Sequence, residues 1–366
     1  MIATPVDTRR VTAGPEFAMA RGVEVTPGGR LWVSWVGGGD NDQAYLVMAF
    51  SNDGGRTWTP PQFRIDPPDR PELRCRARVA TLWSAPDGAL WFFFDQSMGS
   101  FDGRAGVWAT VCRAPDAPRP EWSSPVRLWH GAALNKPIVL RNGEWMLPVS
   151  LWGAEKVRPE RLRGKHAELD PLRGSHVLAS RDRGKTWELR GQVRFEPADF
   201  DEPQLVELRD GCLWMLARTR AGISGSFSSD HGRTWTPPAD TGIAHISSRF
   251  HIQRLRSGRL LLIKHGVLGE RTAQRSHLTA FLSEDDGVSW RGGLLLDGRT
   301  GISYPDAVEL APGIIVATYD RNRTTDAEIL LIDFTENEVL QRSFASGRTP
   351  HSSIINQASL VAIEHL

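Results

Sequence analysis

The sequence predicts an all-β protein, a six-bladed β-propeller whose outer turns carry a repeated Asp-box motif. Two repeats lead to this prediction. A turn glycine between two strand-like runs occurs six times. The motif Ser-x-Asp-x-Gly-x-Thr-Trp occurs at Ser51–Trp58, Ser180–Trp187 and Ser228–Trp235, and with Ser289 in place of threonine at Ser283–Trp290.

The six glycine turns define the repeating unit. Each is preceded by a strand-like run and followed by an apolar or aromatic one, which is the pattern of a β-hairpin. The turn glycines are Gly29, Gly88, Gly143, Gly211, Gly258 and Gly313. They lie 59, 55, 68, 47 and 55 residues apart, a period that suits four-stranded units around an axis. We therefore predict one propeller domain over residues 1–366.

The Asp-box motif is predicted to be a structural turn. Its Ser and Asp side chains can bond nearby backbone, its glycine permits a positive φ, and its Trp can pack onto a core. It lacks the further acidic residues of a calcium-binding EF-hand loop. It follows the hairpin in four of the six units, and Cys112–Trp122 resembles a degenerate copy. The charged insertion Ala154–His176 in the third unit is predicted to be a solvated loop or short helix.

Composition limits the partners and the compartment. A net charge of +1 over 366 residues gives no large field, so neither nucleic acid nor a membrane surface is expected as a main partner. The three cysteines have no disulfide or metal-site spacing and are predicted to be free thiols. The N-terminus lacks the apolar segment of a signal peptide, which predicts a cytoplasmic protein. No cofactor or metal is predicted, and the oligomeric state stays open.

The hairpins also predict where polar residues gather. The start of the first strand and the end of the second lie side by side in an antiparallel hairpin, so six hairpins contribute to one rim. Counting back from the glycines finds Arg21, Arg78, Asn135, Lys136, Glu202, Arg249 and Tyr304. Counting forward finds Val36, Asp95, Ser150, Arg218, His265 and Asp320. One mouth of the ring is therefore predicted to be rich in ionisable groups.

These residue types indicate a chemistry. Converging guanidiniums bind a carboxylate through bidentate, charge-assisted hydrogen bonds. A phenol becomes a useful nucleophile when a neighbouring carboxylate accepts its proton, and Glu202 could do this for Tyr304. Such a pair suits an anionic sugar, because a bare carboxylate nucleophile would be repelled by the sugar's own carboxylate. The leaving oxygen also needs an acid, for which Asp40 and Asp42 are the candidates.

From "ARGVEV" to "YDRNR" the chain resembles the sialidase (neuraminidase) superfamily, and more closely its bacterial Asp-box (BNR-repeat) branch. The resemblance implies a six-bladed propeller, an arginine triad for a substrate carboxylate, a Tyr/Glu nucleophilic pair and an Asp acid/base. "ARGVEV" matches the segment of the first arginine, which gives Arg21. "DEPQLVELRDGCLWMLAR" gives Glu202 and Arg218, "QRSHLTAFLSEDDG" points to Arg275, and "SYPDAVELAPG" gives Tyr304.

The sequence also departs from the family's pattern. Gly22 and Val23 replace the Ile-Pro that follows the first arginine, and the acid/base loop leaves Asp40 and Asp42 as alternatives. The predicted rim is more charged than a pocket for an N-acetyl group needs, which leaves room for another acidic sugar. The residues that make it so are Arg78, Asp95, Lys136, Arg249, His251 and His265.

Three functional hypotheses follow. The first is a retaining exo-glycosidase that hydrolyses a terminal sialic acid or a related acidic sugar, with Arg78, Arg249 and His265 as further substrate-binding residues. The second is a polysaccharide lyase acting on a uronate, in which Tyr304 or His265 moves protons. The third is a carbohydrate-binding propeller without catalysis.

Overall fold

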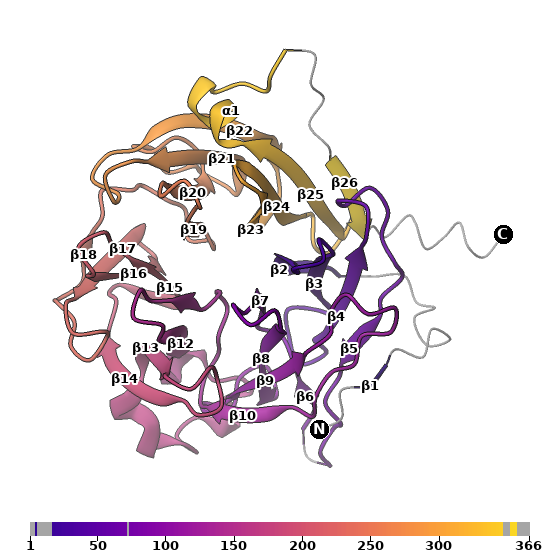
Figure 1. Ribbon diagram of the computed structural model, residues 1–366. Helices are drawn as coiled ribbons and strands as arrows, with labels where there is room; N and C mark the ends of the chain where they lie inside the picture. The colour runs from indigo at the N-terminus through magenta and orange to yellow at the C-terminus, as the bar shows by residue number, and fades with distance from the viewer. Residues whose placement is uncertain (1–3, 6–16, 72, 347–351, 357–366) are drawn as a thin grey trace.

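The computed structural model describes residues 4–5, 17–71, 73–346 and 352–356. Its strands form six sheets arranged around a central axis, as Figure 1 shows. Successive strands pair antiparallel within each sheet, and the chain passes from one sheet to the next around the ring. The prediction of a six-bladed β-propeller is confirmed.

The first half of the chain builds three blades. Blade 1 contains β2 (Met19–Val25), β3 (Leu31–Gly37), β4 (Tyr45–Ser51) and β5 (Phe63–Ile65), with β1 (Thr4–Pro5) added at its outer edge. Blade 2 contains β6 (Cys75–Arg76), β7 (Ala80–Ser84), β8 (Leu90–Met98), β9 (Gly106–Cys112) and β10 (Val126–Trp129). Blade 3 contains β11 (Ile138–Val139), β12 (Trp145–Leu151), β13 (Gly174–Ser180) and β14 (Glu188–Val193).

The second half repeats the arrangement. Blade 4 contains β15 (Ala198–Glu207), β16 (Leu213–Thr219), β17 (Ile223–Ser228) and β18 (Ala239–Asp240). Blade 5 contains β19 (His251–Arg254), β20 (Leu260–His265), β21 (Ser276–Ser283) and β22 (Arg291–Thr300). Blade 6 contains β23 (Ile302–Ala311), β24 (Ile314–Arg321), β25 (Glu328–Thr335) and β26 (Ser352–Asn356).

All six predicted hairpins are present, and each joins the innermost pair of strands in its blade. The turn glycines have positive φ, from 75° at Gly313 to 92° at Gly211. Side chains other than glycine rarely adopt this region, which explains the glycine at each turn. Apolar residues of the strands pack between neighbouring blades, so each blade buries both of its faces.

The Asp-box motifs are structural turns between the third and fourth strands of blades 1, 3, 4 and 5. In blade 4, Asp230 accepts hydrogen bonds from the Thr234 amide at 2.9 Å and hydroxyl at 2.6 Å. Ser228 accepts one from the Gly232 amide at 2.9 Å, and the Trp235 indole donates to the Gly232 carbonyl at 3.1 Å. These turns lie on the outer part of the blades, away from the axis.

Blades 2 and 6 replace the motif in different ways. The segment Cys112–Trp122 lies between β9 and β10, and Trp122 stacks on Phe63 of blade 1 with ring centroids 5.2 Å apart. In blade 6 the helix α1 (Glu336–Gln341) follows β25 and begins with a capping box formed by Thr335 and Glu338. No helix within the described ranges is long and apolar enough to cross a membrane.

The insertion in blade 3 forms three short 3₁₀ turns rather than an open loop. They are η2 (Ala154–Lys156), η3 (Glu160–Leu162) and η4 (Ala167–Leu172). Leu162 and Leu169 are buried against the core, and Arg158 forms a bridge with Phe101 of blade 2. The insertion is therefore anchored to two blades, in part as predicted for a short helix.

A buried cation links three blades near the axis. The Lys136 ammonium lies 3.2 Å from the carboxylate of Glu24 in blade 1 and 3.3 Å from that of Asp306 in blade 6. It also donates hydrogen bonds to the carbonyls of Val23 at 2.5 Å and Ala307 at 3.0 Å. Four oxygens thus surround one ammonium where the inner strands converge.

Replacing Lys136 with methionine keeps the side-chain length and removes this cation. Taking away one partner of a buried ion pair costs about 3–5 kcal/mol, so we expect the free energy of unfolding to fall by about that amount. Urea denaturation followed by tryptophan fluorescence measures it. The matched control is Lys165→Met at an exposed position, with an expected change below about 0.5 kcal/mol. Equal losses in the two variants would contradict a structural role for Lys136.

Candidate active site

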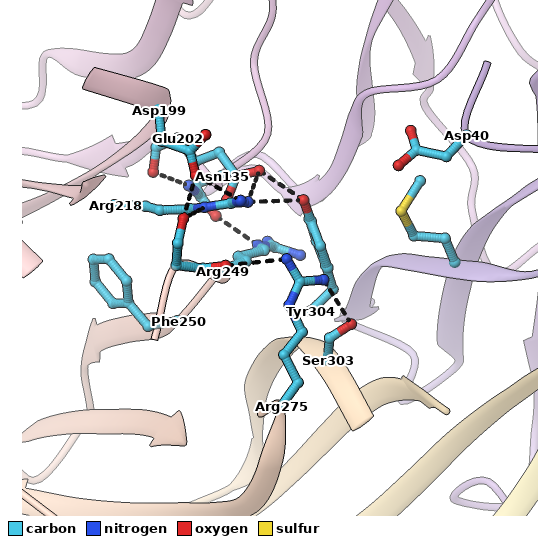
Figure 2. A network of polar contacts seen from close by, with 12 residues as sticks. Asp40, Asn135, Asp199, Glu202, Arg218, Arg249, Phe250, Arg275, Ser303 and Tyr304 are labelled. Carbon is cyan, nitrogen blue, oxygen red and sulfur yellow. Dashed lines mark hydrogen bonds and ion pairs between the residues drawn. The ribbon is translucent and has the colours of Figure 1, made fainter. Parts of the chain in front are cut away.

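Tyr304 of blade 6 and Glu202 of blade 4 meet across the mouth of the ring. The phenol hydroxyl donates a hydrogen bond of 2.8 Å to Glu202 Oε1. Figure 2 shows the two side chains, from β15 and β23, pointing toward one another. Both are largely buried, with 8% of Tyr304 and 6% of Glu202 exposed. Glu202 Oε2 is buried and has no hydrogen-bond partner in the described part of the chain, so this oxygen can still accept a hydrogen bond.

Local backbone geometry turns these two side chains inward. The pairing of β15 with β16 shifts register between Asp201 and Gln204, and that of β23 with β24 shifts between Ser303 and Asp306. Such bulges redirect side chains and are common next to functional sites. The φ angles of Glu202 and Tyr304 are 46° and 56°, a region that few residues other than glycine adopt.

Four arginines surround the phenol. The Cζ atoms of Arg323, Arg21 and Arg275 lie 4.2, 5.1 and 5.7 Å from the centre of the Tyr304 ring. Arg218 donates hydrogen bonds to the Tyr304 hydroxyl at 3.2 Å and to Glu202 Oε1 at 3.1 Å. This is a strong concentration of positive charge around one neutral side chain.

The four arginines differ in their partners. Arg218 pairs with both Glu202 and Asp199, the latter at 2.8 Å, and Arg323 pairs with Asp320 at 2.8 Å. Arg21 bonds the carbonyl of Arg78, and Arg275 bonds the carbonyl of Ser247. Among the described residues no carboxylate lies within 4 Å of either of these two guanidiniums.

Burial lowers the pKa of both Arg21 and Arg275 from the ordinary value of 12.5. They remain charged at neutral pH because the ordinary value is so high. Asp40 and Glu202 offset part of the cost of burying these charges, and an incoming anion would offset more of it. Arg21 and Arg275 are therefore the cations best placed to bind a carboxylate.

A cavity of about 300 Å³ lies beside this cluster. Its inner wall is formed by Arg21, Arg78, Asp40, Glu202 and Tyr304. Its outer wall is formed by Phe101, Trp152, Phe200 and three residues of the insertion, Glu155, Lys156 and Arg158. The volume is at the lower end of the range for small-molecule sites. The insertion, predicted to be a solvated segment, thus supplies part of the pocket wall.

A larger cavity of about 680 Å³ opens at the opposite end of the ring, next to the hairpin turns. Lys136, Glu24 and Asp306 reach it, while Tyr304, Glu202, Asp40 and Asp42 do not line it. Of the predicted catalytic residues, Tyr304, Glu202 and Asp40 line the smaller cavity, and none lines the larger one.

Residues 29–316 match the family model described as a BNR repeat-like domain. The chain belongs to this BNR repeat-like family. No curated protein sequence matches it. Three solved structures similar to this BNR repeat-like protein are a Hadza microbial sialidase, Hz136; the NanB sialidase of Streptococcus pneumoniae; and the intramolecular trans-sialidase of Ruminococcus gnavus.

The three structures match at TM-scores of 0.65, 0.66 and 0.67 and at identities of 18%, 14% and 14%. The matches cover 88%, 93% and 92% of this chain and 66%, 71% and 98% of the respective relatives. The chain thus spans slightly less than two thirds of the Hadza protein. At these identities the likeness establishes a sialidase-like fold for this BNR repeat-like protein.

Of the other predicted site residues, Asp40 and Arg78 line the pocket of this BNR repeat-like protein, whereas Asp42 does not. Asp40 lines the cavity and pairs with Arg78 at 3.0 Å, and Arg78 lines it as well. Asp42 is absent from the wall, and its carboxylate accepts a hydrogen bond from Gln43 at 3.3 Å. Gly38 and Gly39, with φ of 79° and 138°, form a bend in the backbone directly before Asp40.

Arg249 and His265, predicted to bind substrate, lie below the pocket instead of on its wall. Arg249 donates to Asn135 Oδ1 at 2.9 Å and to the Arg21 carbonyl at 3.0 Å, which draws its side chain into the interior. His265 stacks on His245 with ring centroids 5.5 Å apart. Burial lowers the pKa of His265 to about 4, so the ring is neutral at physiological pH. Buried partners thus override the rim position that strand counting predicts.

Sequence reasoning missed Arg323, Asp199 and Ser303. Arg323 lies two residues beyond the end of β24. A count of seven residues from the turn glycine ends at Asp320 and therefore does not reach it. Ser303 accepts hydrogen bonds from Arg323 at 2.6 Å and Arg275 at 3.4 Å, which places both guanidiniums beside the phenol. The run "YDRNR", which ends in Arg323, was the signal that could have found this residue.

The carboxyl group of Asp201, adjacent to Glu202, is buried and has too few hydrogen bonds to replace its lost hydration. Its Oδ1 has no hydrogen-bond partner among the described residues. Burial, together with the carboxylates of Glu196 and Asp199, raises its pKa to about 7. The folded protein therefore holds Asp201 as a neutral acid over much of the range in which the unfolded chain ionises it.

We expect Asp201→Asn to stabilise the protein at alkaline pH. The pKa of Asp201 is 3.8 in the unfolded chain and about 7 in the folded protein. The free energy of unfolding is therefore highest below pH 3.8 and falls by on the order of 4 kcal/mol between pH 3.8 and pH 7. The amide cannot ionise, so the variant should exceed wild type by roughly that amount at pH 8 and by under about 1 kcal/mol at pH 4. Urea denaturation at both pH values measures the difference. Asp87→Asn, at an exposed position, is the control; a pH-independent difference for Asp201→Asn would contradict this account.

Proposed function

We propose that this protein is a retaining exo-glycosidase that removes a terminal sialic acid or a related acidic sugar, with Tyr304 as the nucleophile. The observation that carries the proposal is the 2.8 Å hydrogen bond from the Tyr304 hydroxyl to Glu202, inside a ring of four arginines. The sialidases among the proteins of similar fold support the same reaction class.

Substrate binding begins with the sugar carboxylate. Arg21 and Arg275 have no carboxylate partner of their own among the described residues, and each presents hydrogen-bond donors in a planar fork. Pairing with the substrate would place its anomeric carbon near the Tyr304 oxygen. Arg21 lines the 300 Å³ cavity, whereas Arg275 does not line it and lies 5.7 Å from the centre of the Tyr304 ring. The cavity suits a single sugar ring, with the leaving group directed toward Phe101, Trp152 and Phe200.

The first chemical step forms one bond and breaks one. The Tyr304 oxygen attacks the anomeric carbon and passes its proton to Glu202 Oε1, which already accepts that hydrogen bond. The bond from the anomeric carbon to the leaving oxygen breaks, and Asp40 supplies a proton to that oxygen. In the second step water attacks the anomeric carbon and gives a proton to Asp40, and Tyr304 leaves and recovers its proton from Glu202.

Charge explains why a phenol serves better than a carboxylate here. The substrate carries its own carboxylate beside the anomeric carbon, which would repel an anionic nucleophile. Tyr304 approaches as a neutral group, and the arginines above its ring stabilise the negative charge that develops on its oxygen. Arg218 bonds both Glu202 and Tyr304 and therefore keeps base and nucleophile aligned.

The lyase hypothesis has less support from this arrangement. It used His265 as one proton carrier, but that ring is buried and is not part of the cavity wall. A β-elimination would have to depend on Tyr304 alone.

Tyr304→Phe removes the nucleophilic oxygen and keeps the ring. We expect kcat/KM for a chromogenic sialoside to fall by on the order of 10³-fold or more, as for other lost nucleophiles. A 2,3-difluorinated sialic acid should label wild type on the peptide that contains Tyr304, detected by mass spectrometry. The control is Tyr45→Phe, outside the cavity, which should keep wild-type rates. Unchanged turnover in Tyr304→Phe would refute the proposal.

The arginines should separate into two kinetic classes. Arg21→Gln and Arg275→Gln remove charge-assisted bonds to the substrate carboxylate, worth about 1.5–3 kcal/mol each, so KM should rise by roughly 10- to 100-fold. Arg218→Gln loses its bonds to Tyr304 and Glu202, so kcat should fall instead. Steady-state kinetics measures both, with the exposed Arg113→Gln as control. Equal effects on KM for all three would contradict the assignment.

A further inference from the structure

Asp40 is held at the pocket by one ion pair. Its carboxylate lies 3.0 Å from Arg78 Nη1, which also donates to the Asp40 carbonyl at 3.2 Å. The side chain of Asp40 is 54% exposed, whereas that of Arg78 is 9% exposed. Gly38 and Gly39 precede Asp40 with positive φ, so the loop begins at two residues of high conformational freedom. In Figure 2 the carboxylate lies across Tyr304 from Glu202.

Arg78 is the fixed member of this pair. Its backbone amide donates to Asp95 Oδ1 at 2.9 Å, and its Nη1 donates to Ser100 Oγ at 3.2 Å. Its guanidinium lies 5.9 Å from the centre of the Trp152 ring. These contacts come from blades 2 and 3 and leave Arg78 little freedom. Arg78 therefore has contacts with more elements than Asp40 has.

Four cations act on Asp40, and the pocket wall also carries Glu202, Glu155, Lys156 and Arg158. Arg21 faces it from β2, Arg76 and Arg78 from the inner part of blade 2, and Arg323 from the loop after β24. Burial on the pocket wall tends to raise the pKa of Asp40, but Arg78, Arg21 and Arg323 together lower it below 3.8. The empty pocket therefore keeps Asp40 ionised, although a group that protonates a leaving oxygen must carry a proton.

We propose that Arg78 is a positioning residue that holds Asp40 as a carboxylate in the empty pocket, and that the carboxylate of the bound sugar allows Asp40 to take up one proton from solvent. This inference rests on the proposed function and concerns the control of the same site. The sugar carboxylate pairs with Arg21 and Arg275 and so neutralises one of the cations that face Asp40. It also places a like charge near Asp40 and excludes water, and both changes favour the protonated acid.

The mechanism gives a second level of specificity. A neutral sugar that entered the pocket would leave Arg21 unpaired and Asp40 ionised, so the leaving oxygen would receive no proton. Only an anionic sugar would create its own general acid. The proton taken up on binding goes to the leaving oxygen, and water gives a proton to Asp40 in the second step. Asp40 releases that proton to solvent when the product leaves, so the cycle consumes no net proton.

Calorimetry tests the coupling without turnover. The probe is the 2,3-unsaturated glycal of N-acetylneuraminic acid, titrated at pH 5 into the full chain in two buffers of different ionisation enthalpy. The dependence of the binding enthalpy on the buffer gives the number of protons taken up. We expect wild type to take up between one half and one proton per ligand, and Asp40→Asn to take up fewer than about 0.1.

Three matched variants sharpen the test. Arg78→Lys keeps a cation beside Asp40 and should retain the uptake. Arg78→Gln removes it, so Asp40 is partly protonated before binding and the uptake should fall by at least about half. Asp201→Asn should bind and take up protons as wild type does, because Asp201, with its pKa of about 7, is already protonated at pH 5.

The outcomes separate the two proposals. Binding of the glycal without proton uptake, or equal uptake by wild type and Asp40→Asn, overturns the role of Arg78 and leaves the glycosidase proposal standing. A wild-type protein that does not bind the glycal overturns sialic acid as the substrate of the proposed glycosidase, and this inference with it.

Discussion

A buried carboxylate at the axis of the ring, Asp306, fixes the strand that carries Tyr304, the proposed nucleophile. Its Oδ2 accepts a hydrogen bond of 2.9 Å from the Val23 amide and lies 3.3 Å from the Lys136 ammonium. Its Oδ1 lies 3.3 Å from Arg249 and 3.2 Å from His251. Burial alone would raise the pKa of Asp306, but Lys136, His251 and Arg249 hold it well below its ordinary value. One charge thus joins blades 1, 3, 5 and 6, two residues beyond Tyr304.

The same device recurs around the site. Asp320 in blade 6 accepts the Ala20 amide of blade 1 at 3.0 Å, and it also binds Arg323. Asp95 in blade 2 accepts the amides of Arg78 and Val79 at 2.9 and 2.7 Å. Each carboxylate satisfies backbone donors and orients an arginine at once. Among the arginines around Tyr304, Arg323 is positioned in this way, by a carboxylate that also joins blades 6 and 1.

The sequence predicts the ring well because each blade contains its own local signal. A turn glycine and two apolar runs specify a hairpin without reference to the rest of the chain. Tyr304 and Glu202 could be predicted to meet because both lie on inner strands at the same number of residues before the turn glycine, Gly313 or Gly211. Arg323 could not be found in this way, because it lies in a loop whose direction depends on Asp320 and Ser303.

Side-chain depth is the part that strand counting cannot supply. Arg249 occupies a rim position by count, yet Asn135 and Asp306 draw it beneath the pocket. Asp40 and Asp42 are the same residue type two positions apart, so the sequence does not separate them. In the folded chain, Asp40 follows the bend at Gly38 and Gly39 and lies on the cavity wall, whereas Asp42 does not. Both outcomes depend on contacts between segments far apart in the sequence, which periodicity does not encode.

The site also carries a cost that the surrounding fold must offset. Glu202 and Tyr304 adopt left-handed backbone conformations, and residues in such regions cost of order 1–3 kcal/mol each. Arg21 and Arg275 are held near the phenol without carboxylate partners among the described residues, which is unfavourable in a partly buried setting. The axial ion pairs and packed blades keep these groups in place, so under the proposed function the pocket is organised for an anionic sugar before one binds. Preorganised charge of this kind stabilises a transition state most effectively, because no reorganisation is needed during the reaction.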